Sequence, residues 1–156
     1  KKKLKNYLIL RTNFYGIGPK YRTSFSDWII NSLKNDKKIF MFKDVFFTPI
    51  LINDLSDILK NLIKKNINGI FNVSGKERIS KYQFAVKLAK IFKFRSSLIQ
   101  QISIKEVKLT RRPLDMSLDI TKLKKTIVIK PKSINQSLRY LKKIINSNYY
   151  KKIKSI

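Results

Sequence analysis

Two short apolar runs predict the central strands of the chain. The first is Tyr7–Thr12, and the second is Ile70–Val73, which Ser74-Gly75 closes. Short apolar runs bounded by turn residues are typical of buried strands. The segment Asn13–Pro19, which contains two glycines and a proline, predicts a loop directly after the first strand.

Three helices are predicted by a shared start signal. A serine is followed three residues later by a side chain able to bond back to it, and apolar residues then recur at helical spacing. The three pairs are Ser24 with Asp27, Ser80 with Gln83, and Ser133 with Gln136. The apolar faces behind them are Phe25, Trp28, Ile29 and Leu33; Phe84, Ala85, Leu88, Ala89 and Phe92; and Ile134, Leu138, Leu141 and Ile145.

The middle of the chain predicts two further strands and a helix. Lys38–Phe42 and Phe46–Ile52 have strand character, and Pro49 restricts the second to an edge or a bulge. A helix is expected from Asn53 or Asp54, with Asn68-Gly69 as its end. Its apolar face is Leu55, Ile58, Leu59, Leu62 and Ile63.

The last third predicts smaller elements. Ile102 and Ile104 alternate with polar neighbours, which favours a half-exposed strand. Asp119 is expected to cap a short helix that runs through Leu123. Tyr149–Ile156 is a basic segment that we expect to fray.

Strands that alternate with helices indicate an α/β fold. A parallel sheet needs several strands with both faces covered, and this chain supplies two candidates for central strands. The pattern therefore predicts the later part of a larger α/β fold, with the earlier part upstream of Lys1.

The charge of the chain is extreme and has two explanations. The 156 residues include 36 Lys+Arg against 9 Asp+Glu, a formal net charge of +27, and only seven of the cations are Arg. An anionic partner such as nucleic acid would select cations, but usually Arg, whose planar fork binds phosphate and guanine. Lys spread along the chain, with abundant Asn and Ile, is also what A/T-rich coding drift produces. We favour drift, so a nucleic-acid partner is not expected.

Composition also excludes several classes of site. The chain has no His and no Cys, which excludes disulfides, a thiol nucleophile, a histidine base and zinc sites built on those ligands. Its apolar runs, such as Val45–Ile52, are too short to span a bilayer, and the apolar stretch after Lys1 is too short for a signal peptide. A cytoplasmic protein without a membrane partner is expected.

Catalytic chemistry is sparse. Gly16-Ile17-Gly18 begins a dinucleotide-binding fingerprint, but Tyr21 stands where its third glycine belongs. A Tyr-x-x-x-Lys pair occurs at Tyr150 and Lys154, in a Lys-rich segment where chance matches are common. We therefore assign no catalytic residue and no metal ligand.

Two segments suit an anionic ligand. Arg111-Arg112-Pro113 carries two guanidiniums on extended backbone, which suits a pyrophosphate; pairing of an Arg with Asp115 or Asp119 is the equal alternative. The loop that starts at Thr12 follows a strand, and α/β folds bind ligands at the carboxyl ends of their strands. Its polar side chains also suit plain turn chemistry.

Four sets of segments, spanning about residues 7–140, follow one another in a recognisable order. They are Leu8–Gly16, Phe47–Ile50 with Asn53–Leu55, Gly69–Gly75 with Ile79–Ala85, and Arg112–Asp119. In this order they resemble the C-terminal half of extended short-chain dehydrogenase/reductases, and most nearly the branch similar to dTDP-4-dehydrorhamnose reductase. The absence of Arg-Asp at Phe47-Thr48 favours this branch over epimerases.

The resemblance implies a Rossmann-type NAD(P)-binding fold whose C-terminal half forms the sugar-nucleotide pocket. It implies that Thr12, Asn13 and Phe14 lie beside the nicotinamide of NAD(P)H, that Arg112 meets the nucleotide diphosphate, and that Asn13, Trp28, Thr48 and Ser117 also contact substrate. The main cofactor motif and the catalytic Tyr-x-x-x-Lys pair would lie upstream of Lys1. Residues 1–147 would form the substrate-binding part and residues 148–156 a basic tail.

Three functions remain open at this point. The first is the substrate-binding portion of an NAD(P)-dependent sugar-nucleotide reductase in polysaccharide biosynthesis, inactive alone, with a nucleotide sugar as its partner and a homodimer as a further assembly. The second is a non-catalytic nucleotide-sugar binding or regulatory module of the same fold. The third is a basic nucleic-acid-binding protein.

Overall fold

The structure is a computed structural model that describes residues 6–108, 113–129 and 131–155. The helices are α1 (Phe25–Lys34), α2 (Ile52–Lys64), α3 (Lys81–Phe92), α4 (Thr121–Thr126), α5 (Ile134–Ile145) and α6 (Asn148–Ser155), with short 3-10 turns at Ser96–Leu98 and Ile104–Glu106. The strands are β1 (Leu8–Thr12), β2 (Phe14–Tyr15), β3 (Ile39–Phe42), β4 (Phe46–Phe47), β5 (Ile50–Leu51), β6 (Gly69–Val73), β7 (Ile79–Ser80), β8 (Ile99–Ile102) and β9 (Asp115–Met116).

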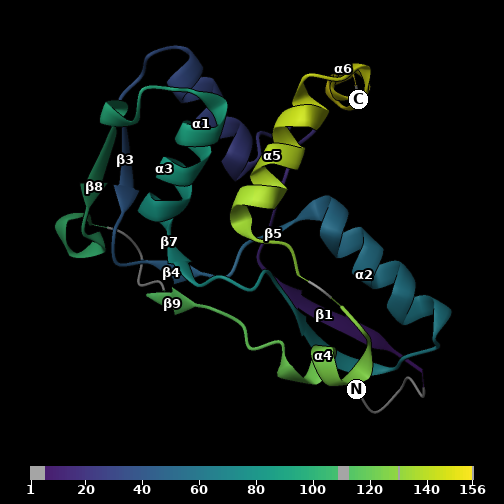
Figure 1. The fold of residues 1–156 in the computed structure, drawn as a ribbon. Helices are drawn as coiled ribbons and strands as arrows, with labels where there is room; N and C mark the ends of the chain where they lie inside the picture. The colour runs from purple at the N-terminus through teal and green to yellow at the C-terminus, as the bar shows by residue number, and fades with distance from the viewer. Residues whose placement is uncertain (1–5, 109–112, 130, 156) are drawn as a thin grey trace.

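Two parallel strand pairs organise the molecule, as Figure 1 shows. β1 lies beside β6, with Leu8 opposite Gly69 and Thr12 opposite Val73. β3 lies beside β8, and α3 packs against both. Parallel neighbours require a crossover between them, so this pairing confirms the α/β class.

Short strands join the two pairs at the centre of the molecule. β4 pairs antiparallel with β7 and parallel with β9, while β2 pairs in parallel with β5. Pro49 lies between β4 and β5, so the single strand expected over Phe46–Ile52 is wrong: the chain forms two strands of two residues there.

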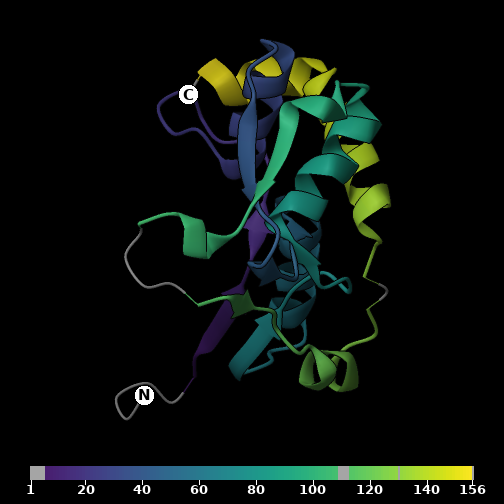
Figure 2. The same cartoon turned by 90° about the vertical axis from the view of Figure 1, so that its left-hand side faces the viewer.

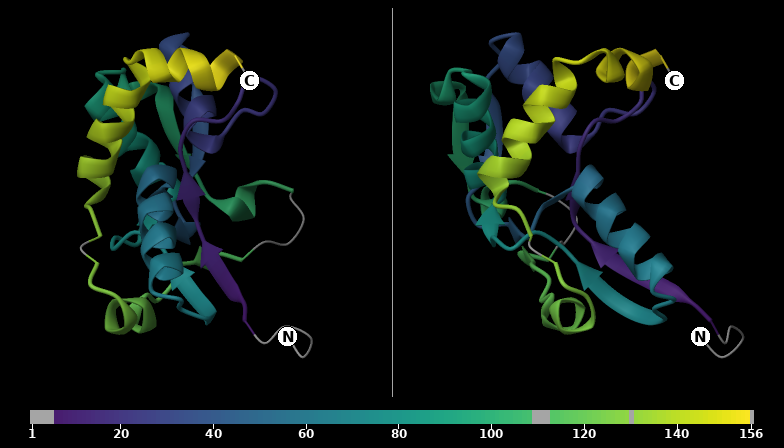
Figure 3. Two further views of the ribbon diagram at one scale, coloured as in Figure 1. Left: turned by 90° about the vertical axis from the view of Figure 1, so that its right-hand side faces the viewer. Right: turned by 45° about the vertical axis from the view of Figure 1, so that its right-hand side comes forward.

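Two separate cores divide the molecule into two halves, one built around β3 and β8 and the other around β1 and β6. The larger one gathers α1, α3 and α5 against β3 and β8, and Phe84 lies fully buried within it. The smaller one packs α2 and α4 against β6 through aliphatic residues and Phe71. Figure 2 shows the halves one above the other, and in both views of Figure 3 the described chain begins at one end and finishes at the other.

All three expected helix starts are confirmed. The hydroxyls of Ser24, Ser80 and Ser133 each accept a hydrogen bond from the backbone N–H three residues on, and the side chain at that position accepts the N–H of the serine. These bonds satisfy backbone donors that the first turn of a helix otherwise leaves unpaired.

Other boundaries differ from expectation. α2 begins at Ile52 without a side-chain cap and ends at Lys64, and Gly69 opens β6 instead of ending the helix. Ile104 lies in a 3-10 turn, so the strand stops at Ile102. The N-cap residue of α4 is Ile120 and not Asp119, which lies one residue earlier and accepts the N–H of Thr121 at 2.9 Å.

The segment expected to fray is a helix. α6 covers Asn148–Ser155 and packs against α5, and Figure 3 shows it at the end of the molecule farthest from the start of β1. Its half-buried residues are Tyr150, Ile153 and Lys154, which lie on one face at helical spacing. Fraying was the wrong expectation because this face contacts the body of the protein.

Candidate functional site

A pocket of about 460 Å³ opens among α1, β3 and α3, and we call it the aromatic pocket. It lies on the surface of the larger core. Its walls are mostly apolar, with one cation among them. The lining residues are Phe25, Trp28, Phe40, Met41, Phe42, Val45, Lys81, Ile104, Pro113 and Met116.

Two exposed aromatic side chains give this pocket its character. Trp28 is 42% exposed and Phe40 63% exposed. The Trp28 ring stacks on Phe25 with centroids 6.4 Å apart and planes 20° from parallel. The capped first turn of α1 places Trp28, and β3 presents Phe40, so both rings are held by regular secondary structure.

Lys81 is the cation of the aromatic pocket. Its ammonium Nζ lies 3.5 Å from the ring centre of Phe47 and 4.6 Å from that of Phe25. Burial penalises the charged form and lowers the pKa of Lys81 to about 8. Among the residues that the structure describes, no carboxylate pairs with this ammonium. An anion or a carbonyl oxygen entering the pocket would find a hydrogen-bond donor there.

Segments far apart in sequence meet beside the aromatic pocket. The Asn13 amide Nδ2 donates to the Met116 carbonyl at 2.7 Å. The buried hydroxyl Oγ1 of Thr48 accepts the N–H of Leu118 at 3.1 Å, and the N–H of Ser117 donates to Asp115. The structure therefore brings the expected residues Asn13, Thr48 and Ser117 together at the β9 segment.

Arg111 and Arg112 lie outside the described residues, so their expected contact with a diphosphate stays a prediction. Pro113, which follows them, lines the aromatic pocket. Asp115 accepts two hydrogen bonds from the Arg78 guanidinium, at 2.8 and 2.9 Å.

A second pocket, of about 390 Å³, lies beside the end of β1, and we call it the loop pocket. Residues 16–19 and 22–24, together with Phe14, Tyr15, Phe25 and Ile52, line it. Phe14 is 60% exposed, and the Thr12 hydroxyl is buried without a hydrogen-bond partner in the described chain.

Sequence reasoning missed Phe40 and Lys81. Phe40 was assigned only to a strand, and nothing in its local pattern separates an exposed from a buried aromatic residue. Lys81 carried a usable signal: it is the first residue of α3, where a cation opposes the helix dipole. Phe47 and Phe84 lie buried in the larger core, whereas Phe92, expected on the apolar face of its helix, is half-buried.

The described residues form neither a metal-binding cluster nor a membrane-spanning helix. No group of three or more Asp and Glu residues there is arranged to hold a metal ion. Within the same ranges, every helix is too short or too polar to cross a bilayer.

Known proteins share this architecture. A dTDP-4-dehydrorhamnose reductase from Bacillus anthracis, solved with NADP, superposes with a TM-score of 0.80 at 23% identity, covering 94% of this chain and 51% of its own. The Clostridium acetobutylicum reductase also gives 0.80 at 23% identity, covering 90% of this chain and 49% of its own. A UDP-glucuronic acid 4-epimerase from Bacillus cereus gives 0.64 at 22% identity, with 89% and 44% covered. The chain thus spans about half the length of these Rossmann-type proteins.

Two sequence matches complete the comparison. The beta subunit of methionine adenosyltransferase 2 from Xenopus laevis is 32% identical over 82 residues, which are 49% of this chain and 25% of that protein. The family model described as the RmlD substrate binding domain matches residues 1–147. The chain therefore belongs to the RmlD substrate-binding-domain family.

Proposed function

We propose that this chain is the nucleotide-sugar-binding portion of an NAD(P)H-dependent sugar-nucleotide reductase, acting in the cytoplasm in polysaccharide biosynthesis. The aromatic pocket carries the proposal, because it joins exposed aromatic rings, one ammonium group and the segment that follows Arg112. A nucleobase stacks well on such rings, and a diphosphate needs cations at the pocket mouth.

Each residue has a distinct role in this proposal. Trp28 and Phe40 would stack the base, and Lys81 would donate a hydrogen bond to a base carbonyl or a phosphate oxygen. Arg112 would bind the diphosphate, as the family resemblance implies. Asn13, Thr48 and Ser117 would shape the sugar end, since their bonds tie β9 to the ends of β1 and β4.

In this proposal the cofactor contacts this chain at the end of β1. Thr12, Asn13 and Phe14 would contact the nicotinamide, and the bound dinucleotide would supply the hydride to the sugar. No glycine-rich phosphate-binding turn occurs in these 156 residues. We therefore expect the chain alone to show no reductase activity.

Calorimetry with dTDP-glucose and UDP-glucose tests the binding role. Trp28→Ala should weaken binding by about fivefold or more, since each base–aromatic stack contributes about 1–3 kcal/mol. Tyr140→Ala is the matched control, because Tyr140 is 43% exposed but lies on α5, outside the pocket.

The same titration tests the diphosphate contact. Arg112→Ala should weaken binding, whereas Arg139→Ala, at an exposed position on α5, should not. Equal affinity in wild type, Trp28→Ala and Arg112→Ala would remove both residues from the site. Absence of binding in the wild type would overturn the proposal.

A non-catalytic binding or regulatory module is the second candidate. The match to a beta subunit of a methionine adenosyltransferase favours it, since that protein is named as a subunit and not as a reductase. The coding sequence upstream of Lys1 discriminates between the two. An open frame with a glycine-rich turn and a Tyr-x-x-x-Lys pair supports the reductase, and a start codon near Lys1 supports the module.

A further inference from the structure

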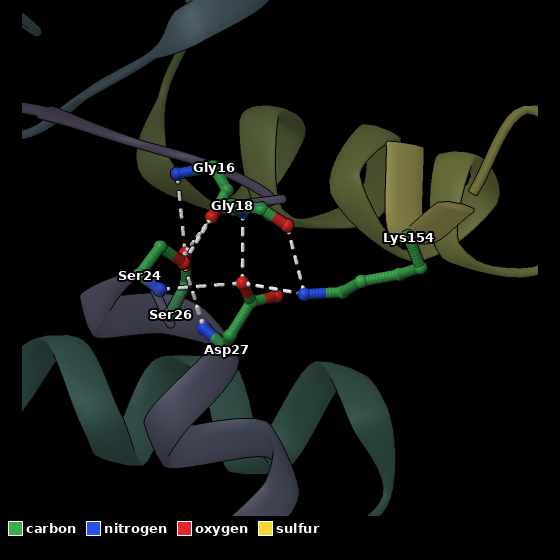
Figure 4. Close-up of polar contacts among 6 residues, drawn as sticks. All are labelled: Gly16, Gly18, Ser24, Ser26, Asp27 and Lys154. Carbon is green, nitrogen blue, oxygen red and sulfur yellow. Dashed lines mark hydrogen bonds and ion pairs between the residues drawn. The ribbon is translucent and has the colours of Figure 1, made fainter. Parts of the chain in front are cut away.

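The wall of the loop pocket is an irregular segment, residues 16–24, held to the first turn of α1. Figure 4 shows these contacts. The Gly16 carbonyl accepts hydrogen bonds from the hydroxyls of Ser24 and Ser26, at 2.5 and 2.6 Å. The Gly18 N–H donates to the Asp27 carboxylate at 2.8 Å. The loop is therefore fixed by polar side chains and not by a strand ladder.

A residue from the far end of the chain completes this arrangement. The ammonium Nζ of Lys154, on α6, donates to the Gly18 carbonyl at 2.8 Å and to Asp27 Oδ2 at 3.0 Å. The Lys154 side chain is 25% exposed and that of Asp27 only 4% exposed. Lys154 thus joins the loop and α1 through one half-buried ammonium group.

Because the Asp27 carboxylate is buried, its ion pair with Lys154 should contribute more to holding the loop than an exposed pair would. A carboxylate withdrawn from water is costly to leave without its cation, whereas exposed ion pairs contribute little. The other described ion pairs join side chains that are more exposed, such as Arg95 with Asp36 at 66% and 68%. The Lys154 Nζ also lies 5.8 Å from the ring centre of Tyr150. The two residues of the Tyr-x-x-x-Lys pair are therefore neighbours on α6, and the Lys154 ammonium makes its hydrogen bonds to the loop and to Asp27.

We propose that Lys154 is a positioning residue and that α6 is a latch which holds residues 16–24 in the shape that lines the loop pocket. The structural part of this inference stands alone, and its consequence for ligand binding rests on the proposed function. The helix α6 then belongs to the site as a working part and is not an appended tail. Removal of the ammonium should loosen the loop while the two cores stay folded.

Trypsin tests the latch directly, because Lys20 and Arg22 are exposed residues within the loop. Lys154→Met should raise the rate of cleavage after Lys20 or Arg22 roughly three- to tenfold under native conditions, as expected for a segment whose local opening has become easier. Lys152→Met, at an exposed position on the same helix, is the matched control and should leave the rate unchanged. Lys154→Arg keeps a donor and should restore most of the protection.

Ligand binding supplies the second readout. Phe25 lines both pockets, so Lys154→Met should also weaken dTDP-glucose binding about three- to tenfold. A cooperative thermal unfolding transition should persist in this variant, and Lys154→Arg should recover the affinity. Unchanged cleavage in Lys154→Met, or equal acceleration in Lys152→Met, would overturn the latch. Changed cleavage with unchanged affinity would overturn its role in binding. No binding by the wild type would overturn the proposed function and leave the cleavage result to decide the latch.

Discussion

The aromatic pocket and the loop pocket lie next to α1 but are held by different forces. The aromatic pocket takes its walls from α1, β3 and α3, which pack on the larger core. The loop pocket takes its main wall from residues 16–24, whose shape depends on polar bonds to Asp27 and Lys154. Apolar packing holds one site, and a few hydrogen bonds hold the other.

The two pockets are therefore sensitive to different substitutions. Truncation of a buried ring should damage the aromatic pocket and also lower the stability of the whole chain, because the walls of this pocket pack on the larger core. Loss of a polar contact should damage the loop pocket locally, since the segment contributes little to either core. Variants in the core, in the loop and at Lys81 should therefore differ in both the size and the place of their effects.

Phe84→Ala should have the largest effect. The Phe84 side chain is fully buried and lies 4.9 Å from Tyr15, 5.6 Å from Phe47 and 5.7 Å from Phe25, between ring centres. The cavity should lower the free energy of unfolding by about 3–5 kcal/mol, measured by urea denaturation. Phe40→Ala, at a mostly exposed ring, is the control and should cost about 1 kcal/mol or less. Equal losses in the two variants would contradict this account.

Gly18→Ala should have an intermediate effect confined to the loop pocket. A Cβ at this position would lie 2.2 Å from the Arg22 carbonyl oxygen, so the backbone of the loop must shift. We expect a cost of about 1–3 kcal/mol and faster trypsin cleavage within residues 16–24. Thr23→Ala, at an exposed position in the same loop, should change neither measurement. Intact protection in Gly18→Ala would show that the loop tolerates other shapes.

Lys81→Met should have the smallest effect on stability and the clearest dependence on pH. Burial lowers the pKa of Lys81 from 10.5 to about 8. Between pH 8 and pH 10.5, Lys81 is protonated in the unfolded chain but largely neutral in the folded one. The free energy of unfolding of the wild type should therefore rise with pH over this range, and Lys81→Met should lose this slope. Urea denaturation from pH 7 to pH 10.5 measures it.

Nucleotide-sugar affinity should move in the opposite direction. The charged Lys81 is the better donor to an anionic ligand, so wild-type affinity should fall as the pH rises through about 8. Lys60→Met, on α2 and outside the pocket, should retain both slopes. A wild-type affinity that is flat across this range would exclude Lys81 from ligand contact.

The sequence alone determined the elements whose signals are local. Ser24, Ser80 and Ser133 start helices because capping bonds reach only three residues along the chain. Apolar runs predicted β1 and β6, which pair in register, and the α/β class followed. Asn13, Thr48 and Ser117 were nominated through motif resemblance, and the structure places them at one junction.

Which polar and aromatic groups come into contact depends on the folded chain and not on local sequence. Exposure of Phe40 depends on what the remainder of the fold leaves uncovered, and the partner of Lys154 lies 127 residues away. A local window records spacing but not burial, so Tyr149–Ile156 looked like a frayed basic segment. The physical reason is that an ion pair becomes consequential only when packing removes it from water, and packing is a property of the whole chain.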